Sequence, residues 1–310
     1  MDFFIHLRAE RIPGWCDSLL WGLLMPSFKL KDSSGNLLID SAYINYGLLA
    51  SGYLAYKETW YGKSKPYVNT DPNQAASWVE DRRYSDDIYS FSASGCVAPI
   101  VFAVGQCFLE ETQVSGSTFT WLFSGATAAT KIYVFDRMRA GGTGPVLLMR
   151  SEAGVVTFNS RMAPLSILGS VVAPAIGPPP TKESPIYGVL QPYVGGTTSV
   201  SGGENVFHAI GYVDVPTNAG QEIAVNMAFT RGARFYPGVN VSAYGPHSVS
   251  EYAWGNGTSV RFAFRSVAAN YMNNLVYSGV VSNQWVNVPT IYPTANYVIT
   301  SNLPIPFSFA

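Results

Sequence analysis

The chain has 310 residues and a formal net charge of −1, and only 13% of its residues are charged. Hydrophobic residues make up 47%, which is too many for a disordered chain. The near-neutral charge gives no electrostatic reason to expect nucleic acid as a partner or attachment to a membrane surface. No apolar stretch reaches the ~18 residues of a transmembrane helix, so we expect no membrane insertion.

Residues 1–25 contain an apolar run over 19–25, which follows a segment with Asp2, Glu10 and Asp17. These acidic residues, and the lack of a small-x-small cleavage site, do not fit a secretory signal. Two interpretations stay open. The segment is either an N-terminal arm that docks on a neighbouring molecule or an extension upstream of the ordered chain.

A short pattern then occurs twice, at 28–41 and at 147–160. Each copy has an alternating arm, a polar turn with one glycine, a second alternating arm and an Asx-Ser end. When Gly35 is aligned with Gly154, the corresponding pairs are Ile39 with Phe158, Asp40 with Asn159 and Ser41 with Ser160. Period-two arms around a glycine that can adopt positive φ are typical of a β-hairpin. We therefore expect two hairpins that superpose, with the glycines at or beside their tips.

Between the two copies, residues 73–83 are the best candidate for a helix, of about two turns. The overlapping run 80–87 is rich in Asp, Glu and Arg. It can be read as a pair of carboxylates for glycan cleavage, but we favour a solvated polar loop with internal ion pairs. Residues 118–123 and 131–135 alternate as strands do.

Beyond the second copy, alternation predicts strands at 206–215, 223–229 and 260–265. Glycine-rich and proline-rich stretches at 139–145 and 173–185 suggest boundaries. The prediction is an all-β protein of two antiparallel β-sandwich-like units related by the repeated hairpin. It has an N-terminal arm at 1–25, a first β domain at 26–139, and a second β domain at 140–310 with an extended C-terminal segment. The alternative is one interleaved domain in which the hairpin alone is duplicated.

Residues that could carry chemistry are few. The three histidines have no metal-ligand spacing, and no GxSxG motif occurs. The three cysteines, Cys16, Cys96 and Cys107, are expected to be free thiols. The alternative to buried thiols at Cys96 and Cys107 is a disulfide between them. We therefore expect no catalytic residue, no cofactor, no metal and no enzymatic activity. Rings for surface recognition of a sugar or protein could come from Tyr244, His247, Tyr252 and Trp254. The alternative is that these side chains fill the core, as aromatic residues ordinarily do.

The elements Ile39-Asp40-Ser41 and Phe158-Asn159-Ser160, the latter with its lead-in at 131–136 and 146–149, resemble a feature of tail-associated structural proteins of tailed bacteriophages. In that family a hairpin that ends in a Phe-Asp-Ser element starts a small β domain. The resemblance implies a virion structural protein of a tail tip, baseplate or tail-fibre base, with no catalytic residues. It also implies copies of itself and other tail proteins as partners, and assembly in the host cytoplasm.

Two other functions are carried as alternatives. One is a host-attachment module that binds a bacterial surface receptor such as a glycan or pilus, and the other is an enzyme that degrades a surface polysaccharide. The low charge and the many aromatic and β-branched residues also leave few charges to keep sheet edges apart. We therefore expect a homo-oligomer, with a trimer as the first guess from family analogy.

Overall fold

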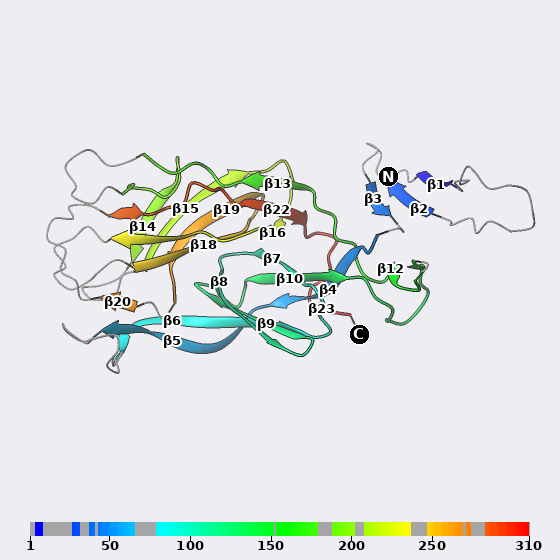
Figure 1. Cartoon of the computed structure of the whole chain (residues 1–310), viewed down its shortest axis with the longest axis horizontal. Coiled ribbons are helices and arrows are strands. Elements are labelled where there is room, and N and C mark those ends of the chain that lie inside the picture. Colours follow the sequence, from blue (N-terminus) through cyan, green and yellow to red (C-terminus); the bar gives the residue numbers. More distant parts are fainter. Residues whose placement is uncertain are drawn as a thin grey trace, which may run out of the picture.

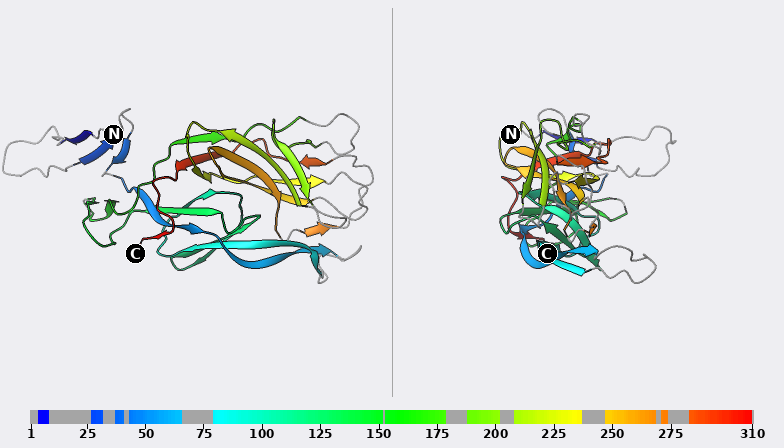
Figure 2. Two further views of the ribbon diagram at one scale, coloured as in Figure 1. Left: turned by 180° about the vertical axis from the view of Figure 1, so that it is seen from behind. Right: turned by 90° about the vertical axis from the view of Figure 1, so that its left-hand side faces the viewer.

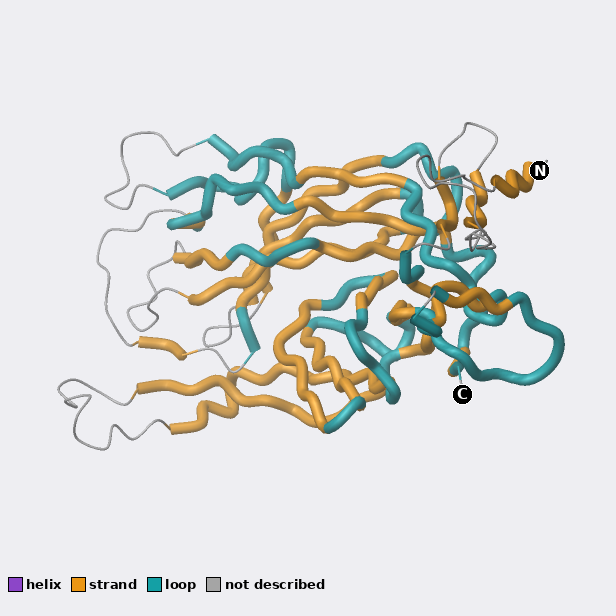
Figure 3. Tube along the Cα trace, turned by 45° about the vertical axis from the view of Figure 1, so that its right-hand side comes forward, coloured by secondary structure: helices purple, strands orange, loops and turns teal. Residues whose placement is uncertain are grey.

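The computed structural model describes residues 4–8, 27–31, 37–40, 43–65, 79–151, 153–178, 188–201, 208–236, 247–268, 271–273 and 283–309. Within these ranges the chain consists of strands, turns and loops, with no helix. The all-β, sandwich-like prediction is confirmed. Strands fill most of the molecule in the tube view (Figure 3).

The largest sheet has 13 strands, eight of which follow one another across it in the order β13-β22-β16-β7-β18-β19-β15-β14 (Figure 1). Their bounds, in that order, are Gly169–Val172, Thr294–Ile299, Ile223–Met227, Ile100–Val104, His247–Asn256, Ser259–Ser266, His208–Pro216 and Thr197–Ser201. Two branches leave this path. From β7 the sheet continues through β10 (Lys131–Arg137) and β4 (Tyr46–Tyr53) to β23 (Phe307–Ser308), and from β18 through β17 (Gly232–Tyr236) to β21 (Gln284–Val286).

A second sheet has five strands in the order β20-β5-β6-β9-β8. They are Tyr271–Asn273, Ala55–Lys65, Val79–Ala93, Thr118–Ser124 and Phe108–Ser115. The remaining sheets are small: β1 (Phe4–Arg8), β2 (Ser27–Lys31) and β3 (Leu37–Asp40) form one, and β11 (Leu148–Arg150) and β12 (Val156–Asn159) form the other. Figure 2 shows the two larger sheets as layers of one body, with β11 and β12 at one end.

Tight turns join several neighbouring strands, and glycine explains two of them. Gly116 and Gly257 have φ of 60° and 62° and come directly after β8 and β18, in two-residue turns. A hairpin turn of this length favours a glycine at its first position, because a side chain there is strained by the positive φ. The local sequence therefore sets the pairing of β8 with β9 and of β18 with β19.

The main core lies between the 13-stranded and five-stranded sheets. Phe108 of β8 meets Trp254 of β18 edge to face at 5.2 Å between ring centroids, and Phe123 of β9 meets Tyr252 of β18 at 6.4 Å. All four side chains are buried. Burial of a large apolar side chain stabilises a fold by about 1.5–3 kcal/mol, so these contacts hold the two layers together.

The largest sheet contains strands from both sides of the predicted domain boundary at 139/140. Its strands β4, β7 and β10 precede that point, and the other ten follow it. A single cluster of core side chains likewise includes Leu49, Trp121, Trp254 and Phe309. This arrangement matches the interleaved alternative rather than two successive domains.

Two local predictions are wrong. Residues 79–93 form strand β6, so the helix candidate 73–83 is not helical from Val79 onward, and its first part lies outside the described residues. The polar run 80–87 is part of that strand and not a solvated loop. Along the strand Asp86 and Ile88 point inward, and Ser85 and Asp87 are exposed. The many charged residues of this run hide the alternation in the sequence.

Candidate functional site

The two copies of the repeated pattern both form antiparallel hairpins, and they pair in the same register. In the first, Lys29 pairs with Asp40, Leu30 with Ile39 and Lys31 with Leu37. In the second, the corresponding pairs under the Gly35–Gly154 alignment are Leu148 with Asn159, Met149 with Phe158 and Arg150 with Val156. Both ladders shift register at the same step, between the second and third pair. The repeat is therefore a repeat of backbone structure as well as of sequence.

Gly154 and the Asx-Ser end have defined roles in the second hairpin. Gly154 lies in its turn with φ of 76°. Asn159 is fully buried, and its Nδ2 donates to the carbonyl oxygen of Arg139 at 2.7 Å while its Oδ1 accepts from the Arg161 amide at 3.0 Å. The exposed Ser160 accepts a hydrogen bond at Oγ from the Leu147 amide at 3.0 Å. With the buried Phe158, these residues close the hairpin and fasten it to the main body.

In the first hairpin, Ile39 and Asp40 lie in β3, where only the backbone is described, and Gly35 and Ser41 lie outside the described residues. The backbone register alone carries the comparison between the two hairpins. The predicted position of Gly35 at the tip stays a prediction.

The expected surface-recognition set is not on the surface. His247, Tyr252 and Trp254 are 2%, 7% and 1% exposed, and Tyr244 lies outside the described residues. Tyr252 and Trp254 are buried because β18 lies inside the largest sheet and faces β8 and β9 of the other layer. His247 lies where β18 pairs with β17. For these three residues the alternative, filling of the core, is correct.

Charged and neutral polar groups from four strands and a loop meet between the two sheets, and we call this group the inter-sheet polar cluster. Arg265 of β19 pairs with Asp86 of β6 and donates to Oγ of Ser124 of β9 at 2.8 Å. Ser124 in turn donates to Glu110 of β8, which also accepts from the Ala268 amide at 3.2 Å. Burial raises the pKa of the Glu110 carboxyl above its ordinary value, although these hydrogen bonds and the Arg265 charge lower it.

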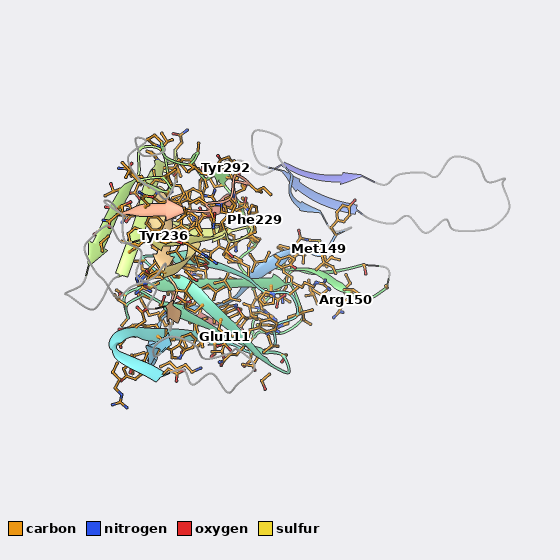
Figure 4. The ribbon with its side chains drawn as sticks, turned by 60° about the vertical axis from the view of Figure 1, so that its left-hand side comes forward. Glu111, Met149, Arg150, Phe229, Tyr236 and Tyr292 are labelled. Atoms are coloured by element: carbon orange, nitrogen blue, oxygen red, sulfur yellow. The ribbon has the colours of Figure 1, made fainter. Side chains whose placement is uncertain are left out.

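A second buried group forms around Glu251 of β18, in the larger sheet. Arg231 donates to both carboxylate oxygens of Glu251 at 2.7 Å, and the Tyr193 hydroxyl donates to the same carboxylate at 2.6 Å. The guanidinium also donates to the Pro289 carbonyl oxygen at 2.8 Å. It lies 5.3 Å from the ring centroid of Tyr292, which Figure 4 labels. Glu251 is 1% exposed, so this carboxylate is enclosed by its partners.

Sequence analysis missed both buried groups. The alternation at 260–265 predicts one apolar and one polar face, which would expose Arg265. In the structure both faces of β19 are covered, and Arg265 is 8% exposed. A buried charged group of this kind is recognised by the burial of a charged residue among apolar neighbours. That burial depends on which strand of the other sheet lies opposite the residue, and the local sequence does not give this.

An open hollow of about 480 Å³ lies where β4, β6 and the C-terminal segment meet. Its cation, Arg139, donates to the carbonyl oxygens of Gly95 and Phe309 and lies 5.7 Å from the centroid of the Phe309 ring. These contacts tie the C-terminal segment to the loop that follows β6. The guanidinium therefore serves the fold at this point.

Cys96 and Cys107 are buried free thiols, and burial raises the pKa of both. Among the described residues, no three or more His, Cys, Asp or Glu side chains are grouped in a way that could hold a metal ion. In the same part of the chain, no helix is long and apolar enough to cross a membrane.

Two groups among the exposed apolar side chains lie on the second hairpin and at a sheet edge. Val146, Leu147 and Val155 are 39%, 52% and 47% exposed on or beside β11 and β12. A second group, Leu168, Val172, Phe229 and Ile291, lies on or beside the edge strand β13 and the ends of β22 and β16. Exposed apolar groups next to strand edges are the features of this surface that fit contact with another protein.

No protein-family model matches the chain, and neither the search of curated proteins nor that of solved structures found a significant match.

Proposed function

We propose that this chain is a virion structural protein of a phage tail tip, baseplate or fibre base. It acts by self-assembly and by docking neighbouring tail proteins, not by catalysis, after assembly in the host cytoplasm. The proposal combines the resemblance of the repeated Asx-Ser hairpin to tail-associated proteins with the structure of that hairpin.

The observation that carries the proposal is the common register of the two hairpins. A short sequence pattern can recur by chance, but the same three residue pairs and the same register shift in both copies support a shared structural unit. In the family that the pattern resembles, this unit opens a small β domain of a tail protein.

The distribution of polar and apolar groups supports a docking role. The natural starting points for acid, base or nucleophile chemistry would be Glu251, Ser124 and Asp86, which are 1%, 0% and 8% exposed. Inside the fold, Glu251 is paired with Arg231, and Ser124 and Asp86 share Arg265 as a partner. Exposed Val146, Leu147 and Val155 instead offer apolar surface on the second hairpin. The alternative, a host-recognition module that binds a glycan or pilus, gains no support from the aromatic set, because three of its four residues are buried. In that alternative, loops of the C-terminal part of the chain supply the binding surface.

Two measurements test the proposal. Light scattering on the full-length chain at tens of micromolar should give the mass of an oligomer, and a stable monomer would count against self-assembly. Mass spectrometry of particles purified from the strain that carries the gene should find peptides of this chain, and immunogold labelling should locate it on the tail. Its absence from the particles, while other tail proteins are detected, would contradict the virion role.

A further inference from the structure

Strand β11 has an edge that is open for pairing. Leu147 accepts a backbone hydrogen bond from Ser160 at 3.1 Å, and its own amide donates to the Ser160 side chain, so its backbone groups point toward β12. Because this direction alternates along a strand, the N–H and C=O of Leu148 point away from β12. Among the described strands, β11 pairs with β12 alone.

The equivalent edge in the first hairpin is occupied. There β2 pairs with β3 in the register already described and, on its other side, with β1. In that pairing His6 lies opposite Lys29, Leu7 opposite Phe28 and Arg8 opposite Ser27. The repeat thus shows which strand, in which direction and register, fits this kind of edge.

We propose that β11 receives β1 (Phe4–Arg8) of a second copy of this chain as a third, antiparallel strand. The Gly35–Gly154 alignment gives the register: His6 opposite Leu148, Leu7 opposite Leu147 and Arg8 opposite Val146. The incoming strand would cover part of Leu147 and Val146, which are 52% and 39% exposed in the single chain. The proposal rests on the proposed self-assembly and names the contact that produces it.

The geometry of this contact determines the type of assembly. Each chain has one β1 and two strand edges that could pair with it, one on β2 and one on β11. In the proposed assembly β1 leaves β2 of its own chain and pairs with the equivalent edge, on β11, of another copy. Exchange of an element between copies is a low-cost route to association. The contact closes as a dimer when two copies exchange β1 with each other, and builds a ring or an open filament when each copy passes β1 to the next. A ring or a filament suits a tail structure.

Disulfide trapping tests the register directly. Leu7 and Leu147 would form a non-hydrogen-bonded pair, with Cα atoms about 4.5 Å apart, a distance at which a disulfide forms. Chains carrying Leu7→Cys and chains carrying Leu147→Cys, both with Cys16→Ser and with tags of different mass, are mixed and mildly oxidised. We expect a cross-linked dimer that contains both tags and disappears on reduction. The matched control replaces Leu147→Cys with Val172→Cys, which is 57% exposed on the edge strand β13.

Three results would overturn the inference. They are no mixed dimer, equal amounts of mixed dimer with the Val172→Cys control, or dimers of Leu147→Cys chains alone, which would indicate symmetric pairing of two β11 edges. Light scattering on the uncross-linked mixture separates this failure from that of the proposed function. An oligomer without the specific cross-link contradicts only the β1–β11 contact, whereas a monomer without it contradicts both.

Discussion

In the inter-sheet polar cluster, burial and the neighbouring groups act in opposite directions on the pKa of Glu110. It is partly buried between two sheets, beside the ion pair of Arg265 and Asp86. Removal of water disfavours the ionised carboxyl, and this effect outweighs the hydrogen bonds from Ser124 and Ala268. The native state therefore holds the proton on Glu110 more firmly than the unfolded chain does.

The raised pKa has a consequence for stability. Between the unfolded and folded pKa values of Glu110, the native state binds more protons than the unfolded state, so the free energy of unfolding falls as pH rises. Glu110→Gln removes this titration. The difference in unfolding free energy between the variant and the wild-type protein should therefore increase from about pH 4.5, the ordinary value, and level off above the raised pKa.

Chemical denaturation at a series of pH values measures this difference. The matched control is Glu111→Gln, because Glu111 is the next residue and is exposed. Its difference from wild type should show no comparable rise. A Glu110→Gln difference that is flat or falls with pH would show that burial does not control this carboxyl.

At the scale of elements, β18 lies against the backbones of β7 and β16 at Gly255. This residue pairs with Val104 of β7, and its carbonyl oxygen accepts from the Gly105 amide at 2.9 Å. A Cβ at Gly255 would overlap the backbone carbonyl of Ile223 in β16. Three strands of the largest sheet thus meet where only glycine fits.

Gly255→Ala should lower the free energy of unfolding by roughly 3 kcal/mol or more, the upper range for overpacking, because backbone atoms must move. Gly232→Ala in β17 is the control. A Cβ there meets only the Val249 carbonyl oxygen, at 3.9 Å, so the change should stay within about 1 kcal/mol. Denaturation midpoints, or the yield of soluble protein if Gly255→Ala fails to fold, measure the contrast. Equal effects would mean that the strands can separate without cost.

Period-two alternation was sufficient to predict β16 and β19, where apolar residues recur at every second position, and the repeated hairpins followed from arms around a glycine. It failed at β6, because Asp86 occupies an inward position that only the opposing Arg265 makes tolerable. It also failed to decide the side chains of β18, where burial covers both faces. Which layer covers a strand is a property of long-range packing, which local periodicity does not contain.

At the scale of the whole molecule, strands from before and after residue 139 depend on each other. β7 pairs with β10 from before residue 139 and with β16 and β18 from after it, so it joins the two parts of the largest sheet. The five-stranded sheet, four of whose strands precede 139, covers Tyr252 and Trp254. The small sheet of β1, β2 and β3 has no strand pairing with the rest of the described chain. The parts of the chain that should fold alone therefore differ from the two domains that the glycine-rich and proline-rich stretches of the sequence suggest.

A fragment of residues 140–310 should not fold cooperatively by itself, because it lacks β7 and β10 and leaves the aromatic face of β18 exposed to water. Mixing it with a fragment of residues 26–139 should restore a β-type circular dichroism spectrum and a single thermal transition. The control, a chain of residues 43–310, removes only the small sheet and should keep the cooperative transition of the full chain. A cooperative transition for 140–310 alone would instead establish two independent domains, and the shared sheet would then be a docking contact between units that fold separately.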